Sequence, residues 1–463
     1  MRKQCASLFV TAACLFCVLV APVQTQSADQ ERDDYELMRV FVDTFEQIER
    51  NYVKDVNRRE LMEAAIQGMV AKLDPYSSYI TPDDLARFNQ MVDQEFGGIG
   101  IHVSVPETTK RLTVVSPLPG TPAYKAGVRA GDVILEIEGE STEGFTIESA
   151  VKLLKGKPGE PVVITVKHDD AEETEEEITV VRAVIQVPTV LGDRYNSDGS
   201  WNFVVDEKNK IGYIRLTHFS RRSGDELRDV LGSLKSDGMQ ALVLDLRTNP
   251  GGLLSQATEI ADLFIEKGMI VKTEGRNTPE RVWNARKAGT YSGFPMAVLV
   301  NRFSASASEI VSACLQDHKR AIIVGERTWG KGSVQNVIEL EEGSSALKLT
   351  TASYLRPSGK NIHRFPGVDE SEEWGVMPND EFEIKLPQDE LREFLVHRRE
   401  RDVLKKDGSP KGDFEDRQLQ KALEHLVKEI GATEAAQEKK SPETEKEDTA
   451  RRGVGSRQSG VPA

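Results

Sequence analysis

The stretch "MAVLVNRFSASASEIVSACL", residues 296–315, decides the fold. Its first five residues are all apolar, as in a strand that is buried on both faces of a sheet. Three serines at every second position follow, and an apolar run begins after Glu309. A buried strand that passes through a polar turn into a helix is the repeating unit of α/β proteins. We therefore expect an α/β core around this segment.

The serines of this stretch have two interpretations. Ser306 and Glu309 match the S-x-x-E capping box, in which side chains satisfy the free amides of a helix's first turn. A serine can also be a nucleophile, but its hydroxyl is a poor one unless a neighbouring group removes its proton. The stretch alone favours capping, so a catalytic interpretation requires a base, an oxyanion site and a substrate-binding element elsewhere in the chain.

Two further apolar strands end in unusual turns. "LVLDLR" runs into "TNPGG" at residues 248–252, and "AIIVGE" runs into "RTWGKGSVQ" at residues 327–335. Strands and helices alternate from Lys210 to about Leu355, which indicates a largely parallel sheet. Ligands bind outside the carboxyl ends of such strands, so we expect these turns and the serine turn to meet there.

A base for the serine must be a histidine or a lysine with a lowered pKa. Lys331 is the lysine candidate, because burial lowers the pKa of an amine from about 10.4 towards 7 and the flanking glycines allow close approach. Gln335 lies four residues on, on the same face in a helix or a strand, and can hold the amine by hydrogen bonding. The histidine candidates are His218, His318 and His363, since His102, His168, His397 and His425 fall outside the core.

Composition limits the class of protein. A chain of 463 residues with 38% apolar content forms two or three globular domains. A formal net charge of −15 argues against nucleic acid as a partner. "MRKQ" followed by the apolar residues 8–21 is typical of a secretory signal peptide, with cleavage near Ala28. Only an uncleaved segment extended by Pro22 and Val23 would anchor the chain in a membrane.

The remaining segments differ in composition and in the periodicity of their apolar residues. Three of the four cysteines fall in the signal peptide, which leaves Cys314 alone and excludes an intramolecular disulfide in the mature chain. Residues 29–94 carry helical periodicity, and residues 95–186 form short alternating strands between Gly and Pro turns. "QLQKALEHLVKEI" is an amphipathic helix, and residues 431–463 contain no Leu, Ile or aromatic residue, which predicts disorder.

The set "FSASASEI", "GKGSVQ" and "DLRTNPGG", with a preceding β domain that contains "GGIGI" and "AGVRAGDVI", resembles the carboxyl-terminal processing peptidases, or tail-specific proteases. The resemblance covers about residues 35–425. It implies an α/β protease core of the crotonase/ClpP-like type, an inserted mostly-β PDZ domain and an N-terminal helical segment. The expected divisions are 1–28 (signal peptide), 29–94 (helical region), 95–186 (PDZ domain), 187–386 (Ser-Lys protease core), 387–430 (C-terminal helical region) and 431–463 (tail).

The resemblance assigns roles to these candidates. It implies that Ser306 is the nucleophile, that Lys331 is the general base and that Gln335 orients the lysine, while Ser304 and Ser308 are structural. The amide of Ala307, at the start of a helix, is free to donate to an oxyanion, and Gly251 or Gly252 supplies the second donor. The PDZ loop that captures a terminal carboxylate with its amides is Gly97, Gly98, Ile99, Gly100 and Ile101.

The function expected from this resemblance is that of an exported serine endopeptidase, located in the periplasm or on the inner membrane, which cleaves envelope proteins at free C-terminal tails. No cofactor or metal is expected. Homo-oligomers and an adaptor protein are the further partners that we consider. The main alternative is a PDZ-based peptide-binding scaffold without catalysis. A trypsin-like protease with PDZ domains would need an all-β catalytic domain and a G-x-S-G-G site, and here the glycine pair stands in "NPGG" without a serine.

Overall fold

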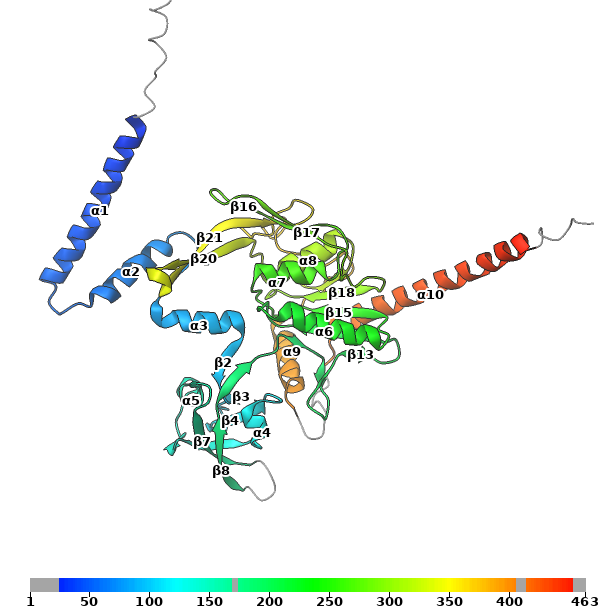
Figure 1. Cartoon of the computed structure of the whole chain (residues 1–463), viewed down its shortest axis with the longest axis horizontal. Helices are drawn as coiled ribbons and strands as arrows, with labels where there is room; N and C mark the ends of the chain where they lie inside the picture. The colour runs from blue at the N-terminus through cyan, green and yellow to red at the C-terminus, as the bar shows by residue number, and fades with distance from the viewer. Residues whose placement is uncertain (1–24, 169–173, 405–413, 453–463) are drawn as a thin grey trace, which may run out of the picture. The chain divides into compact units, whose positions relative to one another are not determined.

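The computed structural model describes residues 25–168, 174–404 and 414–452 (Figure 1). Most of the predicted signal peptide lies outside the described residues. The chain divides into two compact units, residues 1–79 and 80–463, and each is considered by itself below. None of the helices in the described part of the chain is long and apolar enough to cross a membrane.

The first unit is helical, as the periodicity of its sequence predicts. It contains α1 (Thr25–Asn51) and α2 (Arg58–Val70), and β1 (Ser78–Ile80) lies at its end. Asn57 caps α2, because its side chain accepts hydrogen bonds from the amides of Arg59 and Glu60. These bonds satisfy two of the amides that a helix start leaves without a partner.

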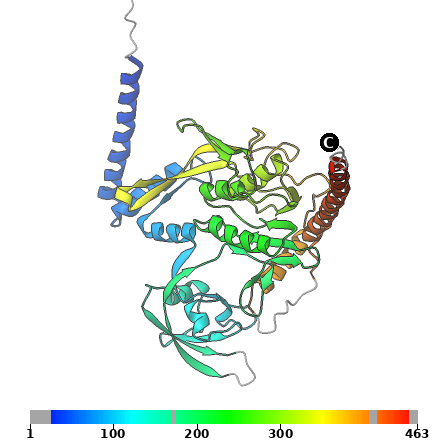
Figure 2. The same cartoon turned by 45° about the vertical axis from the view of Figure 1, so that its right-hand side comes forward.

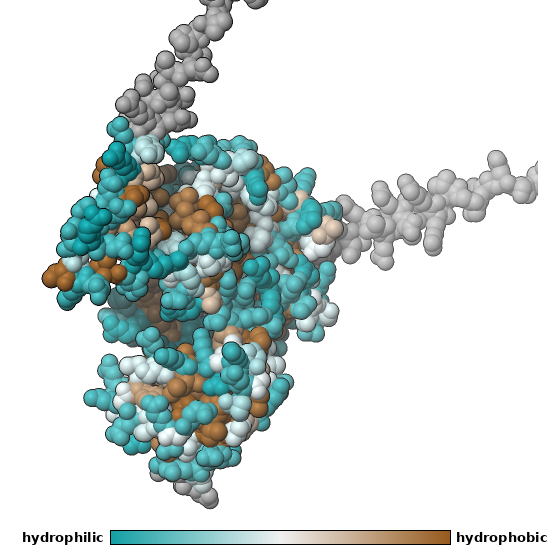
Figure 3. All heavy atoms as spheres, turned by 60° about the vertical axis from the view of Figure 1, so that its left-hand side comes forward, coloured by the Kyte–Doolittle hydropathy of each residue, from teal (hydrophilic) through white to brown (hydrophobic). Residues whose placement is uncertain are grey.

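The second unit begins with α3 (Pro82–Asp93) and continues into a small β domain. The domain's main sheet has the order β3-β4-β5-β7-β8, with β6 paired to β5. Its core is formed by alternate apolar residues of these strands, such as Val114, Ile134 and Ile164. Figure 3 shows further hydrophobic residues on the domain's surface. Its elements are β2 (Glu95–Gly98), β3 (Ile101–Ser104), β4 (Thr113–Pro117), α4 (Pro122–Lys125), β5 (Val133–Ile137), β6 (Glu140–Ser141), α5 (Ile147–Leu154), β7 (Pro161–Lys167), β8 (Glu175–Val181) and β9 (Ala183–Gln186).

Strands β2 and β9 form a separate two-stranded ribbon. They are antiparallel, with Glu95 opposite Gln186 and Gly98 opposite Ala183. The chain therefore enters and leaves the β domain side by side.

The α/β core contains the predicted parallel sheet. Strands β14, β15, β18 and β19 are parallel neighbours, and β10 and β13 pair antiparallel with β14. The strands of the sheet are β10 (Val190–Leu191), β13 (Val204–Asp206), β14 (Ile211–Leu216), β15 (Ala241–Asp245), β18 (Met296–Val300) and β19 (Ile322–Gly325), and a hairpin of β11 (Arg194–Tyr195) and β12 (Trp201–Asn202) precedes β13.

Helices cover both faces of this sheet (Figure 2). On β15, Leu242 and Leu244 pack against α6 (Ser223–Ser236), α7 (Leu254–Asp262) and α8 (Ala307–Asp317). Val243, which points to the opposite face, belongs to a cluster with α10 (Arg417–Arg452). Burial on both faces explains why residues 241–244 of β15 and all five residues of β18 are apolar. Cys314 is buried in α8, as a small hydrophobic residue.

A second, antiparallel sheet follows the parallel one in the chain. Strand β21 pairs with β20 on one side and with β16 on the other, and β17 pairs with β16. The segment that joins β19 to β20 carries "RTWGKG", so it connects the two sheets. The elements are β16 (Gly268–Glu274), β17 (Arg281–Ala285), β20 (Ser333–Leu340), β21 (Ser345–Leu355) and the short 3-10 helix η1 (Glu341–Gly343).

The C-terminal region contains α9 (Gln388–Arg401) and α10. The sequence predicts a helix over 418–430 and disorder beyond it, whereas the structure continues α10 through Arg452. Residues 431–441 are rich in Ala, Glu, Gln and Lys, which have high helix propensity. The helix predicted over 418–430 lies within α10, and the disorder predicted for residues 431–463 stays a prediction.

Candidate active site

Ser306 lies at the turn between β18 and α8. It is the residue before the first turn of α8. Its φ of 56° and ψ of −113° fall outside the backbone regions that residues other than glycine prefer. Such strain persists only where the surrounding structure enforces it, and it is typical of functional sites. Its amide donates a 2.8 Å hydrogen bond to Oε2 of Glu309, which is one of the two bonds of the capping box. Capping and a strained backbone thus occur together at a serine that is buried.

The two flanking serines fasten this turn to the segment after β15. The hydroxyl of Ser304 donates to the carbonyl of Leu246 at 2.8 Å, and that of Ser308 donates to the carbonyl of Asn249 at 3.0 Å. Both hydroxyls are fully buried. They have a structural role, as the resemblance implies.

Gly251 lies directly against the serine turn. A Cβ atom added to it would lie 2.8 Å from Cβ of Ser306 and 2.9 Å from the amide nitrogen of Ala307, and its φ is +101°. Only glycine fits this backbone and this space. The amide of Gly251, however, donates to Oδ1 of Asn249 at 2.8 Å. This amide is therefore already engaged, and the expectation that either glycine supplies the oxyanion donor narrows to Gly252.

The amide of Gly252 points away from its strand neighbour. Gly252 forms a parallel bridge with Phe219, and the two bonds of this bridge involve the carbonyl of Gly251 and the amide of Leu253. In such a bridge the central residue's own amide faces the other side. Among the described residues, no acceptor takes the amides of Gly252 or Ala307. These two donors are available for an oxyanion.

Glu309 joins the serine turn to the segment after β19. Its carboxylate is fully buried and accepts four hydrogen bonds. Oε2 accepts from the amides of Ser306 and Lys331, each at 2.8 Å, and Oε1 accepts from the amide of Gly330 at 2.6 Å and the hydroxyl of Thr328 at 2.5 Å. Burial raises the pKa of Glu309, and these bonds oppose that shift. Because one carboxylate holds both segments, their backbones are fixed relative to each other.

Gln335 lies on β20, beyond Lys331. Its amide nitrogen donates to Oγ of Ser333 at 2.9 Å and to Oγ1 of Thr350 at 3.2 Å. Both of its N–H groups are thereby used. Only its carbonyl oxygen can accept a hydrogen bond from a lysine ammonium, and this is the polarity that the predicted orienting role requires.

The two glycines around Lys331 permit close packing. A Cβ atom on Gly330 would lie 2.9 Å from Cε3 of Trp374, and one on Gly332 would lie 2.3 Å from the amide nitrogen of His363. The ring of Trp374 is held between the guanidinium groups of Arg327 and Arg364, at 4.1 and 4.4 Å from its centroid. The segment of residues 326–332, called the lysine loop below, therefore packs against the ring of Trp374, which the two arginines hold in place.

Sequence reasoning missed Tyr354, which lies on β21. Its phenol is buried and hydrogen-bonds the side chain of Ser306, and burial raises the pKa of this phenol to about 12. Its amide also donates to the carbonyl of Gly332 at 2.8 Å. Tyr354 is one residue of an alternating strand, "LTTASYL", so nothing in its local sequence distinguishes it.

The three candidate histidines have different surroundings. Burial lowers the pKa of His218, which therefore favours the neutral form. His318 caps the opposite end of α8 and donates from Nε2 to the carbonyl of Met269 at 2.7 Å. His363 accepts a long hydrogen bond, 3.4 Å, from the amide of Gly332. Of the three, His363 contacts the lysine loop.

Comparisons with known proteins agree with this architecture. Residues 210–373 match peptidase family S41, residues 113–168 match the PDZ domain, and residues 17–83 match the N-terminal domain of the activating protease CtpB. A carboxy-terminal-processing protease of Bartonella bacilliformis is 36% identical over 433 residues, which cover 91% of this chain and 95% of that protein. The chain belongs to peptidase family S41.

Other relatives of this S41 peptidase align over less of their length. The carboxy-terminal processing protease CtpA of Bacillus subtilis is 36% identical over 322 residues, which cover 69% of this chain and 65% of that protein. The solved structure of a photosystem II D1 C-terminal processing protease is 27% identical, with a TM-score of 0.41, and the match covers 75% of this chain and 92% of that one. The matches to the S41, PDZ and CtpB models and to the Bartonella bacilliformis protease confirm the predicted family and fold class. The parallel sheet of the core excludes the trypsin-like alternative.

The S41 peptidase is thus a serine-type C-terminal processing peptidase with a PDZ domain, which binds peptide tails. In the predicted carboxylate loop, the carbonyl of Ile99 accepts from Ala123 at 2.9 Å, and that of Gly100 accepts from Leu118 at 2.9 Å. Gly97 and Gly98 belong to β2, and Ile101 begins β3. Among the described residues, no group of three or more His, Cys, Asp or Glu side chains is placed to hold a metal ion.

Proposed function

We propose that this peptidase cleaves exported proteins near a free C-terminus, with Ser306 as nucleophile, Lys331 as general base and Gln335 as the group that orients the lysine. The observation that carries the proposal is the shared bonding of the Ser306 and Lys331 amides to one oxygen of Glu309. This shared acceptor joins the turn after β18 to the segment after β19, at the carboxyl ends of the parallel strands.

The reaction proceeds in two halves. The neutral amine of Lys331 takes the proton of the Ser306 hydroxyl while Oγ attacks the scissile carbonyl carbon. The resulting oxyanion accepts hydrogen bonds from the amides of Gly252 and Ala307, and the N-terminus of α8 adds its favourable dipole. The lysine ammonium then gives the proton to the departing amine, which leaves an acyl-enzyme. Water, deprotonated by the same lysine, attacks the acyl carbon; the ammonium then returns the proton to Oγ of Ser306 as the carboxylic acid leaves, which restores the neutral amine.

Tail recognition is proposed for the PDZ loop of residues 97–101. Two of its carbonyls, those of Ile99 and Gly100, are bonded to the domain itself. Within the described part of the chain, no acceptor takes the amides of these two residues. Successive backbone amides are the donors with which PDZ domains capture a terminal carboxylate. We expect this loop to hold the tail while the chain before it reaches Ser306.

The cellular location is proposed from the N-terminal sequence. A charged start followed by an apolar run of residues 8–21 is typical of a signal peptide, so we place the enzyme in the periplasm, with its substrates among envelope proteins. A homo-oligomer or an adaptor protein would present substrates to it. Membrane attachment would require the N-terminal segment to remain uncleaved.

Labelling with a fluorophosphonate tests the nucleophile and separates an enzyme from a scaffold. The wild-type chain should react at Ser306, and Ser306→Ala should neither react nor cleave an unfolded protein. Ser312 is the matched control, because it lies in the same helix with its hydroxyl bonded to the carbonyl of Ser308 at 2.7 Å. Ser312→Ala should keep both labelling and cleavage. Cleavage by the Ser306→Ala chain would refute the proposal, and a wild-type chain that neither labels nor cleaves would support the scaffold.

Amidation of a substrate's C-terminus tests tail recognition. Each charge-assisted hydrogen bond contributes about 1.5–3 kcal/mol, so the amide form should be captured about tenfold or more weakly than the acid form. The measurement is the cleavage rate of the two forms at subsaturating concentration. Equal rates would remove the PDZ loop from the mechanism while leaving the role of Ser306 intact.

A further inference from the structure

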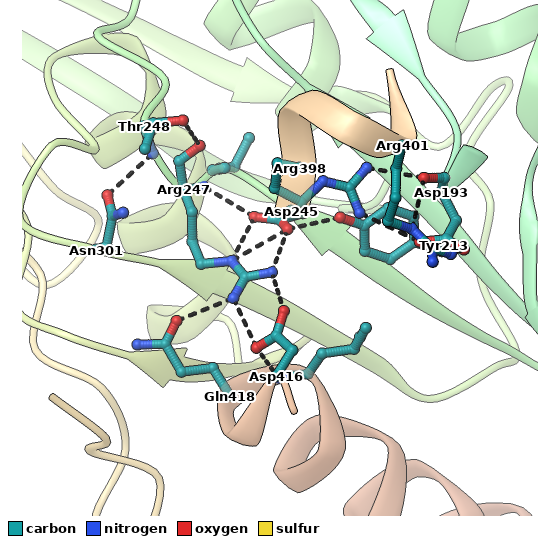
Figure 4. Close-up of polar contacts among 12 residues, drawn as sticks. Asp193, Tyr213, Asp245, Arg247, Thr248, Asn301, Arg398, Arg401, Asp416 and Gln418 are labelled. Carbon is teal, nitrogen blue, oxygen red and sulfur yellow. Dashed lines mark hydrogen bonds and ion pairs between the residues drawn. The ribbon is translucent and has the colours of Figure 1, made fainter. Parts of the chain in front are cut away.

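Arg247, two residues beyond the end of β15, has a fully bonded guanidinium group in the protein interior (Figure 4). Nε and Nη2 donate to the carboxylate of Asp245, at 3.0 and 2.7 Å. Nη1 and Nη2 donate to the two oxygens of Asp416 at 2.9 and 2.8 Å, and Nη1 also donates to Oε1 of Gln418 at 3.0 Å. The group stacks 4.4 Å from the ring centre of Phe394. All of its donors are therefore used, which fixes its position.

The segment that follows this arginine, residues 248–252, supplies the proposed oxyanion donor. Thr248 has a φ of 61°, which is costly for a residue with a branched side chain, and its amide donates to Oδ1 of Asn301 at 2.9 Å. The carbonyl of Asn249 accepts from the amide of Ala305 at 3.0 Å. The path of this segment is therefore determined at both ends, by the arginine on one side and by the serine turn on the other.

Two of the arginine's partners come from the C-terminal helix. Asp416 directly precedes α10 and also accepts from the amide of Leu419 at 3.0 Å, so it caps the helix. Gln418 is fully buried, and its amide nitrogen donates to the carbonyl of Ile384 at 2.7 Å. Ala422 and Leu426 are buried on the same helix, in the cluster that covers one face of the parallel sheet. The start of α10 is thus a fixed part of the core.

We propose that Asp416 and Gln418 are positioning residues for catalysis, which hold Arg247 and thereby the oxyanion segment 248–252. This inference rests on the proposed roles of Ser306 and Gly252. It assigns to the C-terminal helix, far from the nucleophile in sequence, a part in stabilising the transition state. Both act through Arg247 and not by contact with the substrate.

Removing one partner should weaken catalysis without removing the fold. In Asp416→Asn, the buried guanidinium keeps Asp245 as its counter-charge, so it is not left unpaired. Asp416 accepts one bond from Nη1 and one from Nη2 of Arg247. One of these two bonds is lost, because the side-chain amide of asparagine has only one acceptor atom. The arginine can then shift, and a displacement of about 1 Å at a catalytic group can cost about 100-fold in rate.

The matched control is Arg417→Gln. Arg417 lies between the two residues in sequence and pairs with Glu390 at 2.6 Å on the exposed side of the helix. Both variants remove one ion pair at the start of α10, but only Asp416→Asn removes a contact with Arg247. Gln418→Met is the second test variant, because it keeps both carboxylates and is close in size.

The experiment measures kcat, KM and the inhibition constant of a peptide aldehyde in the full chain. The aldehyde forms a hemiacetal with Ser306 whose oxygen occupies the oxyanion site, so its affinity reports on that site. Asp416→Asn and Gln418→Met should lower kcat by about 10- to 100-fold, raise the inhibition constant by a similar factor and leave KM within about twofold. The affinity of an uncleaved peptide for the same variants in a Ser306→Ala background should not change.

Three outcomes would overturn the inference: rates equal to those of Arg417→Gln, a loss of kcat with unchanged aldehyde affinity, or an equal loss of peptide binding. If Asp416→Asn does not fold, Gln418→Met decides. Failure of the proposed function would look different, because cleavage by Ser306→Ala alone would reveal it.

Discussion

The main-chain amides of Ser306 and Lys331 donate hydrogen bonds to the same atom, Oε2 of Glu309, at 2.8 Å each. The proposed nucleophile and the proposed base therefore lie on two segments that this one carboxylate joins. A change at this carboxylate therefore alters both segments at once.

Glu309→Gln should abolish most of the activity. The amide nitrogen of glutamine cannot accept hydrogen bonds, so two of the four donors around this position would lose their acceptor. We expect a loss of about 100-fold or more in kcat/KM and of about 1–3 kcal/mol in the free energy of unfolding. Steady-state cleavage and urea denaturation measure the two effects.

The control for this variant is Glu326→Gln. Glu326 is also buried and lies at the start of the same loop, but it pairs with Arg302 at 2.7 Å and not with the nucleophile. It should lose a similar amount of stability and keep most of its activity. Equal losses of activity in the two variants would mean that Glu309→Gln acts through a general loss of stability and not through the two segments that Glu309 joins.

The pH dependence of the reaction identifies the base. If neutral Lys331 takes the proton, kcat/KM should keep rising above about pH 8, because the fraction of free amine still increases there. A histidine base would give a plateau near or below about pH 7, and burial lowers the pKa of His218 further. The rising limb should persist in His218→Asn and His363→Asn. A profile that is flat from about pH 5 to 9 would contradict the role of Lys331.

Gly251→Ala should displace the serine turn. The added methyl group would lie within 2.9 Å of three atoms of residues 305–307, in a backbone conformation with positive φ. We expect nearly complete loss of cleavage and of fluorophosphonate labelling. Gly289→Ala is the control, because its φ is also positive (+82°) but a methyl group there meets no atom within 4 Å. If both variants lose activity alike, backbone strain and not contact with the turn is responsible.

Tyr354→Phe should lower the rate without changing the fold. The phenol bonds the Ser306 side chain, and it stays protonated over the working range because burial raises its pKa to about 12. Without it, the serine hydroxyl has more freedom, and we expect a fall of about tenfold in kcat with KM unchanged. A pH–rate profile of unchanged shape would show that the phenol orients the serine; loss of the rising limb would make it part of the proton path.

His168 should make the stability of the PDZ domain depend on pH. Its Nδ1 lies 2.9 Å from Oδ1 of Asp132 and its Nε2 lies 3.0 Å from Oε2 of Glu176. Only the doubly protonated ring can donate to both, and the bond to Glu176 is the largest cause that raises the pKa of His168. The stabilisation is therefore complete below about pH 6.5 and is lost as the pH rises through the folded-state pKa.

Calorimetry of the full chain between about pH 5.5 and 8.5 measures this effect. The transition of the PDZ domain should move to lower temperature as the pH increases in the wild-type chain, and the shift should be smaller in His168→Gln. Identical slopes for the two chains would show that the histidine titrates without affecting the domain.

The sequence was sufficient to predict the parallel sheet and the two segments of the site. Residues 241–244 of β15, all of β18 and residues 322–324 of β19 are apolar, and the turns after these three strands carry the Gly, Ser and Lys residues of the candidate site. The resemblance to known peptidases selected Ser306 among three serines, which spacing alone did not. These features are local, so they can be read along the chain.

The contacts that fix the site could not be predicted, because they join distant segments. Glu309 fits a capping box in the sequence, and only the folded chain brings the lysine loop onto the same carboxylate. The amide of Gly251 is as plausible a donor as that of Gly252 until Asn249 is seen to accept from it. Tyr354 and Gln418 stand in an ordinary strand and an ordinary helix, and their role follows only from what they contact.

The ribbon of β2 and β9 has a consequence for engineering. Since Glu95 and Gln186 lie opposite each other, the PDZ domain is inserted into the core through a pair of adjacent chain ends. The entropic cost of closing such a loop rises by only about 0.6 kcal/mol for each doubling of its length, so the core tolerates inserts of very different size. A foreign peptide-binding domain whose termini are close together can be grafted at these two residues, which would change what the enzyme selects and leave unchanged how it cuts.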